Sequence, residues 1–232
     1  MSHGLFARPF SREGACWEEL AIALGASGPT LAGRTADGTA DPSTLAPSFG
    51  ADTVTWTGLT KNTQTAGSFW RAWWALDTPP VGGWWPIFAQ LLATPETLGA
   101  ICGIGIYNGT DPTTANGVWA AVWKDVAGER LYLQANNTTG YSSAATGAVK
   151  VAFQVLAFPV PPADAAIRSH CASAFDDGGN VLQGEERAVT TDWASGDTLY
   201  LHFFLGAKNA AGDVTASDFG GVVGFTDQGL GD

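Results

Sequence analysis

Apolar and polar residues alternate along most of this chain with a period of two, which is typical of strands that bury one face. Turn residues such as Asn108-Gly109 and the Pro79-Pro80 pair separate the alternating segments. Residues 84–92 are apolar apart from Gln90 and fit no single element. The predicted strands cover residues 53–57, 70–76, 101–107, 118–123, 129–134, 149–155, 199–205 and 220–225. The pattern therefore predicts an all-β fold, an antiparallel β-sandwich of the jelly-roll type.

Two segments fit a helical period instead. In residues 12–24, Ser11 is a possible cap, and Trp17, Leu20, Ala21 and Leu24 share one helical face. Residues 163–174 form the second predicted short helix. We therefore expect a mainly β protein with a short N-terminal helix.

Residues 26–50 are rich in Gly, Thr, Pro, Asp and Ser, the composition of an extended arm. One interpretation makes residues 1–50 a docking arm and residues 51–232 the β-sandwich domain. The other has this segment wrap its own domain. In the docking interpretation, apolar side chains anchor the arm on a partner: Phe6, Phe10, Trp17, Leu20 and Leu24.

Tryptophan is unusually frequent, with 10 residues against 11 Lys and Arg together. An indole either anchors a core or provides a flat face for a sugar ring or a partner protein. Alternation places Trp70 and Trp74 on the core face of the strand predicted at residues 70–76. Arg71 and Trp73 lie on the opposite face of the same strand. The candidate residues for partner or glycan binding are Arg71, Trp73, Trp84, Trp85, Trp119 and Trp123. In the alternative interpretation, Trp84 and Trp85 only close one end of the sandwich.

Charge and cysteine content narrow the possible partners. A net charge of −11 makes nucleic-acid binding an unfavoured function, because that function needs clustered Lys and Arg.

No stretch is long and apolar enough for a membrane helix, and acidic residues stand where a signal peptide carries positive charge, so we expect neither membrane insertion nor secretion by that route. Cys16, Cys102 and Cys171 are too far apart for a thiolate metal site and are expected to be reduced.

No catalytic or cofactor motif stands out, so we expect no catalytic residues, no cofactor and no metal site. His202 alternates within a strand, where a structural role is favoured over catalysis. Gly103-Ile-Gly105 lacks the third glycine of a dinucleotide site. Asp176, Asp177 and Asn180 offer oxygen ligands for Ca²⁺ but lack the spacing of a known calcium loop.

Residues 191–206 and 124–133 resemble paired strands of concanavalin-type and laminin-G-like jelly rolls, within a match that covers residues 117–225. That resemblance implies architecture far more than sugar binding, since the family's metal and sugar ligands cannot be placed in this sequence. The whole chain is also similar in style to virion proteins of tailed bacteriophages, with an N-terminal arm, a Gly, Ala and Thr-rich β domain and little Lys. This second resemblance implies a capsid decoration, fibre or tail protein.

We therefore expect a non-enzymatic phage virion protein, made in the host cytoplasm, which acts by assembly and by adhesion to the host surface. Its expected partners are other virion proteins, further copies of itself, with a trimer favoured, and a host surface glycan. The first alternative is a lectin-like carbohydrate-binding module. The second alternative is a glycan hydrolase whose acidic residues meet only in the fold.

Overall fold

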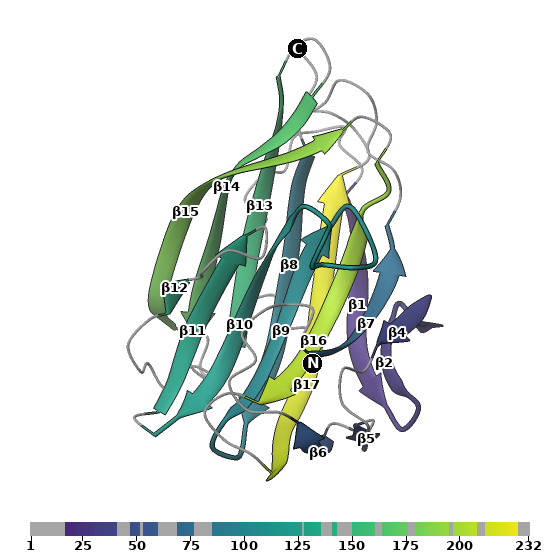
Figure 1. Ribbon diagram of the computed structural model, residues 1–232, viewed down its shortest axis with the longest axis vertical. Coiled ribbons are helices and arrows are strands. Elements are labelled where there is room, and N and C mark those ends of the chain that lie inside the picture. The colour runs from purple at the N-terminus through teal and green to yellow at the C-terminus, as the bar shows by residue number, and fades with distance from the viewer. Residues whose placement is uncertain are drawn as a thin grey trace.

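The computed structural model describes residues 17–40, 47–51, 53–59, 69–76, 85–126, 128–135, 141–142, 150–160, 164–175, 180–194, 197–207 and 212–226. These residues form two antiparallel sheets that pack face to face (Figure 1). Within the described ranges no helix is present, and so none could span a membrane. The fold is an antiparallel β-sandwich of the jelly-roll type, which confirms the predicted fold class.

The first sheet has ten strands. Its main path runs through β15 (Val181–Ala194), β14 (Asp164–Phe175), β13 (Lys150–Val160), β8 (Trp85–Pro95), β17 (Gly212–Thr226), β1 (Trp17–Gly25), β2 (Gly28–Leu31) and β3 (Arg34–Thr35). Two further strands lie off this path, β6 (Val54–Leu59), which pairs with β17, and β5 (Ser48–Phe49), which pairs with β6.

The second sheet has seven strands and carries the candidate site described below. Its order is β12 (Tyr141–Ser142), β11 (Gly128–Ala135), β10 (Gly117–Asp125), β9 (Ala100–Tyr107), β16 (Tyr200–Ala207), β7 (Trp70–Ala75) and β4 (Gly38–Ala40). Sequence neighbours β9, β10 and β11 form a meander, whereas β16 arrives from far along the chain and separates β9 from β7.

The main core lies between the two sheets and follows the predicted alternation. On β7, Trp70, Ala72 and Trp74 are buried, and the residues between them are partly exposed. Trp56 on β6 is also buried, and its indole N–H donates to the Gly206 carbonyl oxygen at 3.1 Å. Pairing this N–H avoids the cost of a buried unsatisfied donor.

The first predicted helix is wrong for its described part, since residues 17–24 lie in β1 between β17 and β2. Ile22 and Leu24 are buried whereas Ala21 and Ala23 are exposed, which is a period of two. Leu20 and Leu24, which are four residues apart, also fit one face of a helix. Pairing along two neighbouring strands satisfies the backbone of β1 and decides between the two periods.

The docking interpretation also needs correction where the structure can be described. Leu24 belongs to the main core and Leu20 packs against it, so neither is available to anchor an arm on a partner. Strands β1 to β5 pair within the two sheets, so the described part of residues 1–50 belongs to the sandwich. Trp17 lies in β1, and Phe6 and Phe10 lie outside the described residues.

The second predicted helix, residues 163–174, is wrong as well. Residues 164–175 form β14, which pairs with β13 on one side and β15 on the other. Its alanine content favours a helix locally, but two long antiparallel partners override that propensity.

Candidate functional site

The outer face of the seven-stranded sheet, which points away from the main core, carries a second group of buried rings and most of the polar groups discussed below. Alternation along β9 sends Cys102, Ile104 and Ile106 into the main core. Gly103 and Gly105 therefore lie on the outer face. The second cluster of buried residues consists of Phe69, Ile101, Tyr107, Trp119, Ala121, Trp123 and Phe204. This sheet thus has apolar layers on both sides.

Cross-strand pairing lines up five outer-face residues across β4, β7, β16, β9 and β10. The row runs Gly38, Trp73, His202, Gly105 and Trp119. At one end of this row Gly38 lies beside the Trp73 ring, and at the other end Gly105 lies beside Trp119. A Cβ atom at Gly38 would collide with the Trp73 indole, and one at Gly105 would lie 2.7 Å from Cβ of Trp119. The glycines thus allow the rings to pack directly on the backbone of neighbouring strands.

His202 lies at the centre of this row and is fully buried. Its ring centroid is 5.3 Å from that of Tyr107, 5.7 Å from that of Phe204 and 5.9 Å from that of Trp73. Nε2 is 3.0 Å from the Gly109 carbonyl oxygen. A carbonyl oxygen can only accept, so Nε2 carries the proton and donates.

The other ring nitrogen of His202, Nδ1, is buried and has no hydrogen-bond partner within the described part of the chain. The pKa of His202 is lowered to about 4; burial is the largest cause, and nearby Arg71 acts in the same direction. The Gly109 carbonyl and the Asp111 carboxylate act in the opposite direction. The imidazole is therefore neutral near pH 7.

Arg71, Trp73 and Asp111 form a polar and aromatic group at the border of this face, which we call the Trp73 patch. The Arg71 guanidinium carbon lies 5.8 Å from the centroid of the partly buried Trp73 ring. Nη2 of Arg71 is 3.8 Å from Oδ1 of Asp111, and the two side chains are 11% and 53% exposed. The patch therefore combines an indole, a largely buried cation and a half-exposed carboxylate.

Hydrogen bonds within its own turn fix the Asp111 carboxylate. Oδ1 accepts from the Thr113 backbone N–H at 3.0 Å and from the Thr113 hydroxyl at 2.7 Å. These two bonds, and to a smaller extent Arg71, lower the pKa of Asp111. Burial lowers the pKa of Arg71, and Asp111 acts against that shift. Both groups are charged at neutral pH.

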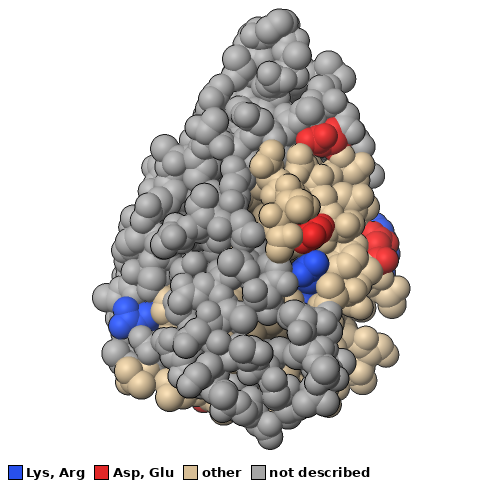
Figure 2. Space-filling view, viewed as in Figure 1, with Lys and Arg blue, Asp and Glu red and all other residues tan. Residues whose placement is uncertain are grey.

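Neighbouring loops hold the patch in place. The Asp37 backbone N–H donates to the Trp73 carbonyl oxygen at 2.8 Å, and the Asp37 carboxylate accepts from the Ala75 N–H at 2.7 Å. These bonds hold Gly38 against the Trp73 ring. In Figure 2 the described surface of this face is mainly uncharged, with a few acidic and basic groups, some of which lie side by side.

The predicted binding residues are only partly brought together. Arg71 and Trp73 meet in the patch, whereas Trp119 and Trp123 are on the same face but are 0% and 2% exposed. An open stacking platform on those two indoles is therefore wrong, because they are packed into the second cluster. Trp84 lies outside the described residues, and Trp85 lies in β8 of the other sheet.

Two residues of the site, Asp111 and His202, were not among the predicted binding residues. The alternation of β16 marks His202 as an outer-face residue, but its neighbours depend on the strand order. Asp111 follows the Asn108-Gly109 turn, and only the folded loop brings it to Arg71. No sequence signal identified that contact.

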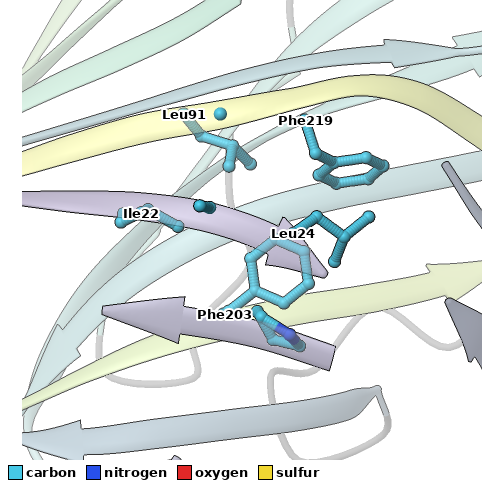
Figure 3. Close-up of a pocket in the computed structure, with 8 residues that line it drawn as sticks. Ile22, Leu24, Leu91, Phe203 and Phe219 are labelled. Atoms are coloured by element: carbon cyan, nitrogen blue, oxygen red, sulfur yellow. The ribbon is translucent and has the colours of Figure 1, made fainter. Parts of the chain in front are cut away.

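A separate shallow depression, too small to hold a water molecule, lies near the edge of the main core (Figure 3). Its lining includes Ile22 and Leu24 from β1, Leu91 from β8, Phe203 from β16 and Phe219 from β17. Every lining residue is apolar or glycine, so no side chain could orient a polar ligand. This depression is a packing feature of the core rather than a second binding site.

Metal ligands do not gather within the described ranges, where no group of three or more His, Cys, Asp or Glu side chains could hold an ion. Of the residues considered for Ca²⁺, Asp176 and Asp177 lie outside those ranges and Asn180 lies inside them. Cys102 is a buried free thiol in the main core.

No known family model and no curated protein matches the chain. Several solved structures are similar to it. Peanut lectin with a nine-residue peptide is 10% identical, with a TM-score of 0.48 over 91% of this chain and 98% of that one. The CBM2 module of the Lactobacillus casei BL23 phage J-1 evolved Dit is 6% identical, with a TM-score of 0.49 over 92% and 100%. Bacillus licheniformis β-glucanase is 10% identical, with a TM-score of 0.36 over 95% of each chain.

Proposed function

We propose that this protein binds a carbohydrate at the Trp73 patch and does so without catalysis. The observation that carries the proposal is the grouping of a partly exposed indole with a guanidinium and a half-exposed carboxylate on one sheet face. This grouping corresponds to the carbohydrate-binding alternative of the sequence analysis, with Arg71 and Trp73 kept from its candidate residues and Trp119 and Trp123 left out.

The three groups match the chemistry of a sugar ring. A pyranose has an apolar face of C–H groups and a rim of hydroxyls, each of which can donate and accept hydrogen bonds. The exposed part of the Trp73 indole offers apolar contact, the Asp111 carboxylate accepts from hydroxyls and the Arg71 guanidinium donates. Such sites combine apolar contact with a few fixed polar groups.

The state of Asp111 favours binding over glycoside hydrolysis. A glycosidase general acid needs a raised pKa, so that it is protonated at working pH. The pKa of Asp111 is lowered by Thr113 and Arg71, which keeps this carboxylate ionised. We therefore expect the protein to bind oligosaccharides without releasing reducing ends.

Binding can be tested by titrating the protein with a panel of bacterial and plant polysaccharides while following tryptophan fluorescence. Trp73→Phe and Asp111→Asn should each weaken binding at least tenfold. Trp70→Phe on the opposite face of the same strand and Glu96→Gln in an exposed turn are matched controls that should bind normally. Absence of any spectral change at millimolar glycan would contradict the proposal. Binding that survives both patch variants would move the site elsewhere.

A second candidate is a structural role in a phage virion, in which copies of the chain assemble side by side. Strand β15 favours it: this strand is 14 residues long, ends the ten-stranded sheet and pairs only with β14 among the described strands. A strand edge of that length is a template for pairing with another chain. Light scattering would test this role, because a monomer at micromolar concentration contradicts self-assembly through β15.

A further inference from the structure

The connection between β9 and β10, residues 108–116, folds back over the outer face and is fastened there. Its two ends are tied together, since the Asn116 N–H donates to Oδ1 of Asn108 at 2.8 Å. The Asn108 amide also donates to the Asp197 carboxylate at 2.8 Å. In the first half of the connection, the Gly109 carbonyl oxygen accepts from His202 and Asp111 faces Arg71. We call residues 108–116 the latch loop.

The closed latch loop requires a neutral His202. A proton on Nδ1 would add a second N–H donor where the described structure supplies no acceptor, and it would place a charge among three aromatic rings. Both effects are costly in a buried site. Lifting the loop removes the Gly109 carbonyl from Nε2 and admits water, which solvates the imidazolium.

Among the residues that the structure describes, three titratable or charged side chains face His202. Arg71 from β7 opposes a second positive charge, whereas Asp111 from the latch loop favours it. Tyr107 from β9 presents a ring that is edge-on to the imidazole. The Asp111 carboxylate lies on the latch loop itself. Opening the loop therefore removes its attraction for the charged imidazole, but it also relieves the burial of His202.

Resting on the carbohydrate-binding function proposed above, we propose that the latch loop is an acid-released gate of the Trp73 patch. With a neutral His202 the loop stays closed and keeps Asp111 beside Arg71 and Trp73. Uptake of one proton by His202 releases the loop and withdraws Asp111 from the patch. A bound saccharide then loses its carboxylate partner and dissociates.

The expected size of the effect follows from proton linkage. In the open loop the imidazole has its ordinary pKa of about 6.5, whereas burial in the closed form lowers the pKa to about 4. The opening equilibrium should therefore rise as pH falls below 6.5, by up to tenfold per pH unit, and should level off near pH 4. The total change is at most about 300-fold, which is 2.5 powers of ten.

Amide hydrogen exchange of the full chain tests the gate without any ligand. The Thr114 and Ala115 N–H groups donate to the Asp111 carbonyl oxygen, and the Asn116 N–H donates to the Asn108 side chain, so all three report on the loop. Their protection, referred to unstructured peptide rates at each pH, should fall steeply between pH 6.5 and 4. It should not change with low concentrations of urea, because local opening exposes little surface.

Two variants separate the latch from general acid effects. His202→Phe keeps a ring and removes the titration, and His202→Gln keeps a donor for Gly109. In either folded variant the protection of the loop should be lower at pH 7 or unchanged, and in both it should be insensitive to pH. Constant protection of the wild-type loop from pH 7 to 4, or an equal pH dependence in the variants, would overturn the gate.

Exchange and glycan binding give separable outcomes. Acid-dependent protection supports the gate even if no polysaccharide binds, in which case only the carbohydrate function fails. If a glycan binds while the loop stays equally protected at every pH, the gate fails and the carbohydrate function stands. If both hold, the dissociation constant should rise in acid for the wild type and not for His202→Phe.

Discussion

Trp119 on β10 and Phe204 on β16 lie on strands that do not pair with each other, yet their ring centroids are 5.2 Å apart. The strand between them, β9, has Gly105 at that position, and a Cβ atom there would lie 2.7 Å from Trp119 and 2.9 Å from Phe204. The missing side chain therefore lets the two rings meet across an intervening strand. Phe69 completes the group, with its centroid 5.2 Å from that of Trp119.

Replacement of this glycine should destabilise the fold. Gly105→Ala forces Trp119, Tyr107 or Phe204 to move, and overpacking of this kind costs about 1–3 kcal/mol. Gly220→Ala is the matched control, because nothing lies within 4 Å of a Cβ atom built at Gly220 in β17. Urea unfolding should show a lower midpoint for the first variant only. Equal midpoints would mean that the rings can shift at no cost.

Strand β1 should behave as part of the sandwich. Ile22→Ala removes a side chain that is 5% exposed in the main core and should lower the free energy of unfolding by about 2–4 kcal/mol. The neighbouring Ala23 is exposed, so Ala23→Ser should change the free energy of unfolding by less than about 0.5 kcal/mol. Thermal or urea unfolding distinguishes the two. A detached helix in this region predicts little effect from either change.

The wild-type protein should lose stability in mild acid. Because the folded pKa of His202 lies near 4 and the unfolded value near 6.5, the unfolded chain binds a proton that the folded chain excludes between these values. The contribution is fully present above pH 6.5 and falls by up to about 3 kcal/mol as pH decreases to 4. Urea unfolding at several pH values should show this slope in the wild type and a smaller one in His202→Phe. Equal slopes would assign the acid sensitivity to other groups.

Cys102 should be unreactive until the protein unfolds. Burial raises the pKa of its thiol, and only the thiolate reacts quickly with disulfide reagents or alkylating agents. A variant with Cys16→Ser and Cys171→Ser isolates this thiol. Its modification should be slow in native buffer and complete within minutes in urea. Fast native labelling would contradict a closed core at β9.

The sequence predicted the sandwich because eight of its segments alternate with a period of two and are separated by turn residues. It also predicted the two faces of β7, with Trp70 and Trp74 inside and Arg71 and Trp73 outside. Segment 17–24 was misassigned because its apolar residues fit periods of both two and 3.6 residues. Only the partners β17 and β2 decide between those periods.

The candidate site was harder to predict because it depends on strand order. His202 lies beside Trp73 and Gly105 only because β16 inserts between β7 and β9, nearly a hundred residues after β9 in the chain. Gly103 and Gly105 were considered for nucleotide binding and rejected, but their actual role needs rings from two other strands. The contact of Asp111 with Arg71 depends on the fold of one loop.

The pairing of β1 with β17 affects how this protein folds during synthesis. Trp17 pairs with Thr226 and Ala23 pairs with Gly220, so the first described strand has its partner at the opposite end of the described chain. β17 also fills the place between β1 and β8. Until β17 has been synthesised, β1 and β8 each present an uncovered edge and an apolar face. The ten-stranded sheet can close only after residue 226 has left the exit tunnel, and contacts so far apart in sequence favour slow folding.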